Sequence, residues 1–545
     1  MQGLMMDRQL TITSIMEYAD LNHPDAEIVS VTCDSPRHRY TYADAFRRTR
    51  RLAHALIDYG VQQGDRIATF AWNDYRHFEL YYAIAGIGAV THTVNPRLFP
   101  DQITYIVNHA QDRLVFVDPL IVPALEKIKD DLPCVEAYIV LTDDGNMPET
   151  ELNNAQSYES FIGSRPDRID WPELDEKTAC CLCYTSGTTG NPKGVLYHHR
   201  SMVLHTLIGI SPDCFDLSVS DVVMPVVPMF HVNAWGLAYG APIAGTKLVF
   251  PGPKMGDGAT LQALIEEERV SYSAGVPTVW LNLLKYLDET GRQVETLKRV
   301  VIGGSACPRS IMEEFEERHG VYVHHAWGMT EMSPLGTFNT LKPQMQKLSG
   351  EEQFAIREKQ GRALYGVEMK IVDDENNELP WDGQSTGLLK VRGPFICSDY
   401  YDTGVPSDVH DEDGWLSTGD VGSIDAEGYL QITDRSKDVI KSGGEWISSI
   451  DLENTAVGHP DVAEAAVIGV PHPKWGERPL LIVVRKEGRE ADKEEILGWL
   501  KDKVAKWWLP DDVVYVDDIP HTATGKIRKT ELRKRFNDYI FDLND

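Results

Sequence analysis

The stretch of sequence with the clearest chemical potential is Tyr184-Thr-Ser-Gly-Thr-Thr-Gly-Asn-Pro-Lys-Gly194, which follows an apolar run. Its glycines let the backbone come close to an anion, and successive N–H groups can form a concave anion site. Its four Ser and Thr hydroxyls can donate to phosphate oxygens, and Lys193 adds a positive charge. Pro192 stands where a Walker A loop needs the glycine before its lysine, so that loop type is excluded. The pattern predicts a phosphate-binding loop, with a polar surface loop as the structural alternative.

Residues further along carry groups that a nucleotide needs. Thr330 and Glu331 offer a hydroxyl and a carboxylate, which suit a phosphate and Mg²⁺, although a helix N-cap with a first-turn acid is the ordinary explanation. Trp327 is a flat apolar surface on which adenine could stack, but alone it is more typical of a core residue. Asp420 can accept hydrogen bonds from ribose hydroxyls and Arg435 can donate to them, whereas without this context Asp420 is a turn residue.

Taken together, these stretches resemble the signatures of the adenylate-forming superfamily, which includes acyl-CoA synthetases, luciferases and non-ribosomal peptide adenylation domains. The resemblance covers essentially the whole chain, and the signatures occur in the family's order. Besides the phosphate-binding loop, they are Pro228-Met-Phe-His231, Gly303-Gly-Ser-Ala306, Trp327-Gly-Met-Thr-Glu331, Ser417-Thr-Gly-Asp420, Asp434-Arg435 and Thr524-Gly-Lys526. Any one of them is a weak signal, but together and in register they are specific.

The resemblance implies an AMP-forming acyl-CoA synthetase that uses ATP and CoA as substrates and Mg²⁺ as cofactor. In such enzymes a carboxylate attacks the α-phosphate of Mg·ATP, which gives an acyl-adenylate and diphosphate. The CoA thiol then attacks the acyl carbon and expels AMP. This chemistry requires no cysteine nucleophile, in agreement with the scattered positions of the eight cysteines.

The family's functional residues carry over onto the matching positions of this sequence. The resemblance assigns catalytic roles to Lys526, His231 and Lys193. It assigns contacts with ATP or the adenylate to Thr185, Ser186, Gly187, Thr188, Thr189, Gly303, Gly304, Ser305, Ala306, His325, Ala326, Trp327, Gly328, Met329, Thr330, Asp420, Arg435, Lys437 and Lys441. It assigns contacts with the acyl group or CoA to Val232, Trp235, Gly443, Gly444, Glu445 and Trp446, and contacts with the metal to Thr185 and Glu331.

Two lysines carry the expected chemistry of the C-terminal region. A lysine after a Thr-Gly pair is usually a solvated charge, but by resemblance Lys526 bridges the acid and the α-phosphate. Two anions meet there and the transition state gains negative charge, so one mobile ammonium offsets both effects. Lys437, otherwise an exposed linker lysine, matches the family's hinge, about which the C-terminal domain turns between the half-reactions. The second orientation would bring the Gly443-Gly444 loop over the pantetheine channel.

The acyl substrate is less specified by the sequence. Lys441-Ser-Gly-Gly-Glu-Trp-Ile-Ser448 resembles bacterial fatty acyl-CoA synthetases, in which the residue matching His231 contacts the carboxylate and that matching Trp235 gates the acyl tunnel. Asn95-Pro-Arg-Leu-Phe-Pro100 resembles the medium-chain subgroup, which includes 3-methylmercaptopropionate ligases. We expect a short- or medium-chain acid in a modest apolar pocket beside Gly236, Gly240, Gly336 and Trp235. The alternatives are a long-chain synthetase, a luciferase-like oxygenase, a carrier-loading acyl-AMP ligase and a non-catalytic acyl-binding protein.

The order of apolar runs predicts the fold class. Runs at residues 66–72 and 114–118 alternate with amphipathic stretches such as 78–87, which is typical of an α/β fold with mostly parallel sheets. After about residue 360, short strands separated by Gly and Asp turns predict a β-rich unit. With the resemblance, this gives a large N-terminal adenylate-forming domain, with two α/β sheet subdomains and a small β-rich subdomain, and a small mobile α+β C-terminal domain. The expected boundaries are 1–434 for the AMP-binding domain, 435–441 for the hinge and 442–545 for the mobile domain.

The charge balance excludes some partners. Lys and Arg total 53 and Asp and Glu total 83, so the formal net charge is −30. A nucleic-acid binder needs a basic footprint, so no nucleic acid is expected, whereas a locally positive site can still bind small anions. We expect a positive cleft inside a negative shell, formed where five cations converge, namely Lys193, Arg435, Lys437, Lys441 and Lys526.

The cysteines and the lengths of the apolar runs indicate the cellular compartment. The cysteines of Ala179-Cys-Cys-Leu-Cys-Tyr184 lack a second pair at zinc-site spacing, so a buried strand with free thiols is expected, which suits a reducing compartment. The first residues do not form a secretory signal, and no window reaches about 18 apolar residues, so no integral membrane contact is expected. The cytoplasm is the expected location, and the resemblance implies a homodimer.

Overall fold

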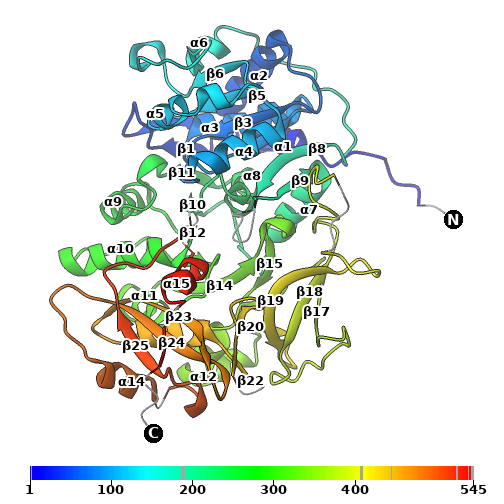
Figure 1. Ribbon diagram of the computed structural model, residues 1–545. Helices are drawn as coiled ribbons and strands as arrows, with labels where there is room; N and C mark the ends of the chain where they lie inside the picture. Colours follow the sequence, from blue (N-terminus) through cyan, green and yellow to red (C-terminus); the bar gives the residue numbers. More distant parts are fainter. Residues whose placement is uncertain are drawn as a thin grey trace.

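The fold is seen in a computed structural model of the 545-residue chain. The structure describes residues 1, 3–185, 191–404, 409–442, 445–501, 503–522, 526–537 and 539–541. Within these residues the strands form three sheets, of 7, 13 and 5 strands. In Figure 1 the seven-stranded unit is at the top, the C-terminal unit is at the bottom, and the long sheet runs between and beside them.

The first sheet is parallel except at one edge, where β9 runs antiparallel to β8. Its strands, in spatial order, are β7 (Gln156–Ser157), β6 (Ala137–Val140), β5 (Asp112–Val117), β3 (Arg66–Phe70), β4 (Val90–Thr93), β8 (Ala179–Tyr184) and β9 (Gly194–His198). Strand side chains alternate between faces, so Ile67 packs in one apolar cluster and Ala68 and Phe70 pack in the other. A sheet buried on both faces accounts for the apolar runs predicted as strands.

Helices cover both faces of this sheet. One cluster is built with α2 (Tyr42–Tyr59), α3 (Tyr75–Gly86) and α6 (Tyr158–Ile162), and the other with α4 (Pro100–Ala110) and α5 (Val122–Glu126). Local signals fix where these helices begin. The Thr41 side chain accepts from the Asp44 N–H in a capping box before α2, and the Asp74 side chain accepts from the His77 N–H before α3.

The long sheet joins a parallel half to an antiparallel half. The parallel half contains β1 (Glu27–Ser30), β11 (Lys247–Phe250), β10 (Val222–Pro225), β12 (Tyr272–Gly275), β13 (Arg299–Ile302) and β14 (Tyr322–Gly328), with β2 (His38–Thr41) antiparallel at its edge. The antiparallel half contains β15 (Leu335–Phe338), β16 (Gly361–Ala363), β20 (Tyr429–Arg435), β19 (Leu416–Ile424), β18 (Gly387–Arg392) and β17 (Glu368–Val372). The predicted β-rich subdomain is therefore continuous, through β14 and β15, with the second α/β sheet.

Two groups of helices pack on the parallel half. On one face lie α9 (Gly258–Glu268), α10 (Pro277–Thr290) and α11 (Arg309–His319), and Pro277 opens α10 as its sequence position predicts. The largest apolar cluster combines α1 (Ile12–Asn22), α3, α7 (His199–Gly209) and α8 (Leu237–Ala244) with residues of both large sheets. A further helix, α12 (Gly350–Arg357), precedes β16. The large sheets thus share one core.

The C-terminal unit is an α+β sandwich. Its sheet contains β22 (Glu445–Ile447), β21 (Ile440–Ser442), β24 (Gly476–Arg485) and β23 (Val462–His472), with β25 (Asp512–Tyr515) beside β24. One cluster involves α13 (Ser449–Val457) and α14 (Lys493–Lys501), and the other involves α15 (Lys529–Arg535). Figure 1 shows α15 at the side of this unit that faces β14.

A short turn links β20 to this unit. The Asp438 and Val439 N–H groups both donate to the Arg435 carbonyl, and the Ser436 N–H donates to the Gly419 carbonyl. The predicted hinge, 435–441, thus contains the last residue of β20, this turn and the start of β21. Along the described part of the chain, no helix is both long and apolar enough to cross a membrane.

Candidate active site

The β8–β9 hairpin presents the predicted phosphate-binding loop. The two strands pair up to Tyr184 opposite Gly194. Beyond that pair, the Thr185 N–H donates to the Lys193 carbonyl at 2.9 Å, and the Lys193 N–H donates to the Thr185 hydroxyl oxygen at 3.1 Å. The two ends of the loop are therefore tied together. The predicted contacts between them, Ser186, Gly187, Thr188 and Thr189, lie outside the described residues.

The Asp420 carboxylate connects the side chains predicted to bind the nucleoside. This side chain is only 6% exposed. Its Oδ2 accepts a hydrogen bond from Trp327 Nε1 at 2.9 Å, and its Oδ1 lies 2.9 Å from Arg435 Nε. Asp420 in β19 and Arg435 at the end of β20 are opposite each other in the ladder. The predicted ribose-binding pair is therefore in direct contact, and the predicted adenine-stacking indole is attached to it.

The Gly303-Gly-Ser-Ala306 segment follows β13, close to the end of β14. A Cβ on Gly303 would lie 2.8 Å from the Ala326 carbonyl oxygen and 3.1 Å from the Trp235 ring, so only glycine allows this approach. Gly304 has a φ of 80°, in the left-handed region that glycine favours. Gly304 and Ser305 are exposed and Ala306 is half-buried, so this backbone is open to a ligand.

His325, another predicted nucleotide contact, lies beneath that segment. Its Nδ1 is 2.9 Å from the Glu358 carbonyl oxygen, and its ring also interacts with the Ser305 backbone. Burial lowers the pKa of the His325 imidazole to about 4, so the ring is neutral at pH 7. The His325 side chain thus helps to fix the Ser305 backbone.

A tight turn follows β14 and presents the Thr330-Glu331 pair. Gly328 allows the two ends of this turn to approach closely, because a Cβ there would lie 2.1 Å from the Pro334 carbonyl oxygen. The Met329 N–H donates to the same carbonyl at 3.0 Å. The Thr330 carbonyl accepts from the buried Tyr197 hydroxyl at 2.6 Å. These contacts fix the backbone on which the predicted metal ligand sits.

Glu331 has the chemistry expected of a magnesium ligand. The residue is 7% exposed, and its Oε1 accepts from the Tyr400 hydroxyl at 2.6 Å. Mg²⁺ is usually held by one or two carboxylates together with substrate phosphates and water, so a single carboxylate beside a phosphate-binding loop fits this ion. The second predicted ligand, Thr185, lies at the mouth of that loop.

The C-terminal unit brings Lys526 to the same site. Its ammonium interacts electrostatically with Arg435, Asp420 and Glu331. Burial and the charge of Arg435 lower the pKa of the Lys526 ammonium to about 8. The Lys526 N–H donates to the Thr522 hydroxyl oxygen at 3.0 Å, which fixes the backbone at this point. The structure thus combines the side chains predicted to bind the nucleoside with the predicted catalytic lysine.

His231 also interacts electrostatically with the Lys526 ammonium, whose charge disfavours protonation of the imidazole. Burial and the Lys526 charge lower the pKa of the His231 imidazole to about 4. The ring is therefore neutral at pH 7 and can donate or accept one hydrogen bond, which suits contact with a carboxylate or carbonyl oxygen.

A left-handed turn, Val232–Gly236, follows His231. Its φ angles are 42° at Val232, 54° at Asn233, 50° at Ala234, 55° at Trp235 and 84° at Gly236. A left-handed conformation costs roughly 1–2 kcal/mol for each residue other than glycine, so surrounding contacts must hold this turn. Such strain occurs at functional sites, where the structure fixes a side chain in one orientation.

Asn233 supplies those contacts from the centre of the turn. It is fully buried, and its carboxamide oxygen accepts from the Cys183 thiol at 3.2 Å. Its amide nitrogen donates to Cys181 Sγ at 3.1 Å and to the Tyr239 hydroxyl oxygen at 3.3 Å. The turn that carries Trp235 is thus attached to β8, the strand that enters the phosphate-binding loop.

The glycines predicted to line an apolar pocket are in close contact with neighbouring side chains. A Cβ on Gly336 would lie 2.6 Å from the Trp327 ring, and one on Gly240 would lie 2.8 Å from Ile210. A Cβ on Gly236 would lie 3.2 Å from the His205 ring. Neighbouring side chains thus pack closely against these glycines, and an apolar pocket beside them stays a prediction.

The structure describes some of the predicted residues in and after the linker but not all of them. Lys437 is an exposed residue, but partial burial and the charges of Arg435 and Arg533 lower the pKa of its ammonium, against the opposing effect of the Asp438 carboxylate. Lys441 is exposed on β21, and its backbone N–H donates to Glu477. Gly443 and Gly444 lie outside the described residues. In β22, Glu445 is opposite Ser442 and Trp446 is opposite Lys441.

The structure thus combines Lys526, Arg435, Asp420, Glu331 and His231 in one site. Lys193 joins them through Tyr400, because its ammonium lies 4.6 Å from the centre of the Tyr400 ring, whose hydroxyl binds Glu331. Sequence reasoning missed three residues of this site, Tyr400, Asn233 and Tyr197. The only sequence signals were an aromatic pair after Gly393-Pro394 and an asparagine beside His231.

Comparisons with known proteins bear on the family to which the chain belongs. A family model described as AMP-binding enzyme matches residues 16–401, and one described as AMP-binding enzyme C-terminal domain matches residues 451–526. The chain is 49% identical over 543 residues to the 3-methylmercaptopropionyl-CoA ligase of Ruegeria pomeroyi, covering 99% of this chain and 100% of that one. It is 48% identical over 540 residues to the medium-chain-fatty-acid–CoA ligase of Ectopseudomonas oleovorans, covering 99% and 98%.

Among solved structures, the ATP-bound MatB of Rhodopseudomonas palustris superposes with a TM-score of 0.81. Its sequence is 25% identical, and the match covers 97% of this chain and 99% of that one.

The pKa of Lys526 gives a pH prediction. Because the ammonium form predominates below about pH 8, kcat/KM for ATP should fall as the pH rises through that value. In Lys526→Arg the guanidinium remains charged to above about pH 12, so its activity, although lower, should lack this alkaline decline. Initial rates of diphosphate release across the pH range measure both profiles. The same alkaline decline in the two enzymes would contradict the assignment.

Proposed function

The chain belongs to the AMP-binding enzyme family and is an AMP-forming acyl-CoA synthetase, an acid–thiol ligase, and we propose that its acid substrate has a short or medium chain. The observation that carries the proposed mechanism is the group formed by Lys526, Arg435, Asp420 and Glu331. It combines a mobile-domain lysine with the groups that a nucleotide and its metal require.

In the first half-reaction we assign nucleoside binding to the Asp420 group. Asp420 and Arg435 would hold the ribose hydroxyls, and the Trp327 indole, fixed by its N–H on Asp420, would lie against the adenine. The phosphate-binding loop with Lys193 would hold the phosphates. The acid carboxylate would meet the α-phosphate beside Lys526, whose ammonium offsets the repulsion between the two anions and the charge that develops in the transition state.

Mg²⁺ would be held by Glu331, with Thr185 as the second predicted protein ligand. When bound, the ion neutralises charge on the phosphates and helps to orient them. Glu331 and Tyr400 form the part of this site that belongs to the protein.

The neutral His231 would contact the acid carboxylate, and the apolar part of the acid would extend past Val232 and Trp235. Both of these side chains are buried on the left-handed turn, with the Trp235 ring against Gly303. The two relatives with 49% and 48% identity act on 3-methylmercaptopropionate and on medium-chain fatty acids, according to their names. We propose 3-methylmercaptopropionate or a medium-chain fatty acid as the substrate.

In the second half-reaction we propose that the C-terminal domain turns about the 435–441 linker. The turn around Lys437 is closed by two local hydrogen bonds to the Arg435 carbonyl and by one from the Ser436 N–H to the Gly419 carbonyl, so a change of backbone angles there disturbs few backbone hydrogen bonds. That motion would remove Lys526 and bring the segment with Gly443, Gly444, Glu445 and Trp446 to the pantetheine channel. Lys441 at the edge of that segment would follow the same motion.

We further propose that the enzyme works in the cytoplasm and forms a homodimer. Light scattering coupled to size-exclusion chromatography measures the molar mass in solution and therefore tests the homodimer.

Removing the Lys526 ammonium should separate the half-reactions. We expect Lys526→Ala to slow acyl-adenylate formation by about 10²-fold or more, since a charge-stabilising donor is lost. Conversion of a supplied acyl-adenylate to acyl-CoA should be largely spared. Diphosphate release measures the first step and mass detection of acyl-CoA the second, and equal losses in both would refute the role.

Restricting the linker should have the opposite selectivity. Lys437→Pro fixes one backbone angle, so it should slow acyl-CoA formation from the adenylate more than it slows adenylate formation. Lys437→Ala is the matched control, because it removes the charge and leaves the backbone free. An unchanged thioester step in Lys437→Pro would remove the hinge proposal.

A panel of carboxylic acids tests the substrate. With ATP, Mg²⁺ and CoA, we expect the highest kcat/KM for 3-methylmercaptopropionate or for acids between butyrate and decanoate, measured by mass detection of the acyl-CoA. A preference for palmitate would favour the long-chain alternative. Diphosphate release with no acyl-CoA would favour a carrier-loading ligase, and oxygen consumption with light emission would favour the luciferase-like alternative.

A further inference from the structure

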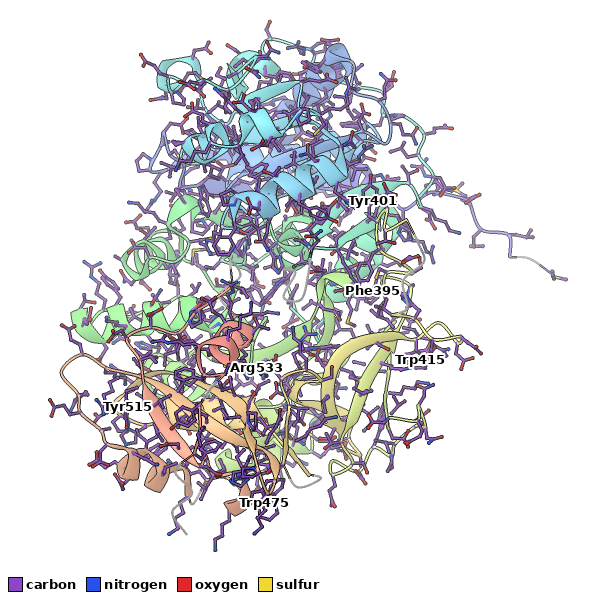
Figure 2. All side chains as sticks on the ribbon, in the orientation of Figure 1. Phe395, Tyr401, Trp415, Trp475, Tyr515 and Arg533 are labelled. Atoms are coloured by element: carbon purple, nitrogen blue, oxygen red, sulfur yellow. The ribbon has the colours of Figure 1, made fainter. Side chains whose placement is uncertain are left out.

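A segment of ten residues, Gly393–Asp402, connects the two parts of the site that handle phosphate and metal. At its start, the Ser333 hydroxyl donates to the Phe395 carbonyl at 2.8 Å, and the Cys397 N–H donates to the Glu331 carbonyl at 2.8 Å. At its end, the Tyr401 N–H donates to the Gly194 carbonyl at 2.8 Å. Figure 2 shows Phe395 below Tyr401, with Tyr401 next to the upper unit. The segment therefore joins the turn that carries Glu331 to the exit of the phosphate-binding loop.

Tyr400 is the residue of this segment whose side chain faces both parts. Its hydroxyl donates to Glu331 Oε1 at 2.6 Å, and its ring lies 4.6 Å from the Lys193 ammonium. The half-buried Tyr400 has a pKa raised by burial and by the Glu331 charge, so its phenol stays protonated and remains a donor. One carboxylate oxygen of Glu331 is thereby occupied, and the other remains for a metal ion.

A carboxylate that binds a metal is usually fixed by a hydrogen bond from a second residue. Without the Tyr400 hydroxyl, the buried Glu331 carboxylate would have to be fixed by other contacts before it could bind a cation. The Tyr400 ring can also hold the lysine near the phosphates, because an ammonium is attracted to the face of an aromatic ring. One side chain thus orients two groups that act on the same triphosphate.

We propose that Tyr400 is a positioning residue for Mg·ATP, which orients Glu331 through its hydroxyl and Lys193 through its ring. The inference rests on the proposed metal role of Glu331. It predicts that Tyr400 matters for the nucleotide that carries a metal and little for AMP, which needs no metal at this point.

The test is equilibrium binding of α,β-methylene-ATP, which cannot form the adenylate, at increasing Mg²⁺ concentration. For Tyr400→Phe we expect the Mg²⁺ concentration at half-saturation to rise about 10-fold or more, the usual effect of losing such a partner. Binding of AMP without Mg²⁺ should change less than about twofold. Tyr400→Leu, which also removes the ring, should weaken binding of the analogue further, even at saturating Mg²⁺.

Tyr401→Phe is the matched control. Within the described residues no hydrogen bond is seen for the Tyr401 hydroxyl, and this residue contacts Gly194 through its backbone. Its Mg²⁺ dependence should equal that of the wild type. Thermal unfolding of each variant shows whether the chain is folded, and Tyr400→Phe keeps the ring that packs in the segment.

Two outcomes would overturn the proposal. One is an unchanged Mg²⁺ dependence in Tyr400→Phe, and the other is an equal loss of affinity for AMP and for the Mg²⁺-bound analogue. If the wild type itself binds the analogue without regard to Mg²⁺, or if Glu331→Gln leaves its Mg²⁺ dependence unchanged, the metal role of Glu331 fails instead. The two failures are therefore distinguishable.

Discussion

The Asp420 carboxylate binds two partners at once, the Trp327 indole N–H and the Arg435 guanidinium, and the geometry of the site depends on this contact. Burying a carboxylate costs free energy unless its oxygens have hydrogen-bond or ion-pair partners. The two contacts of Asp420 therefore favour this one arrangement of the three side chains. It fixes the end of β14 against β19 and against the last residue of β20. Because Arg435 is also the first residue of the predicted 435–441 linker, the side chains predicted to bind the nucleoside and the base of the C-terminal unit share a single anchor. Any reorientation of that unit must therefore occur beyond Arg435.

The charges follow from the same arrangement. The chain has a net charge of −30, yet its substrates are anions. Arg435 lies where its charge acts on both Lys526 and Lys437, and the depressed pKa values of these two lysines reflect burial together with that repulsion. Such a concentration of cations is tolerable because Asp420 and Glu331 lie among them. Incoming phosphates would add further negative charge among these cations, and the positive cleft inside a negative shell stays a prediction.

The sequence predicted what depends on local pattern. The strands around residues 66–72 and 114–118 and the helix opened by Pro277 were predictable, since apolar periodicity and capping residues act over a few positions. Asp420, Arg435 and Glu331 were predictable as a group only through the family resemblance. Tyr400 and Asn233 were not, because their roles come from contacts with Glu331 and with Cys183, which are 69 and 50 positions away. The close contacts of Gly236, Gly240 and Gly336 were not predictable for the same reason, since the side chains that pack against them come from other elements.

The phosphate-binding loop is fixed on both sides by contacts of this long-range kind. Its entry strand, β8, holds the left-handed turn through Asn233, and its exit at Gly194 is held by the Gly393–Asp402 segment. The first contact leads to the residues proposed to bind the acyl group, and the second leads to the proposed metal ligand Glu331. Ordering a Gly-rich loop on a triphosphate costs conformational entropy, and fixing the two ends of the loop reduces that cost before the ligand arrives. The hydrogen bonds of Asn233 to β8 therefore have two effects. They hold the strained turn in its left-handed conformation, and they fix the strand that enters the loop.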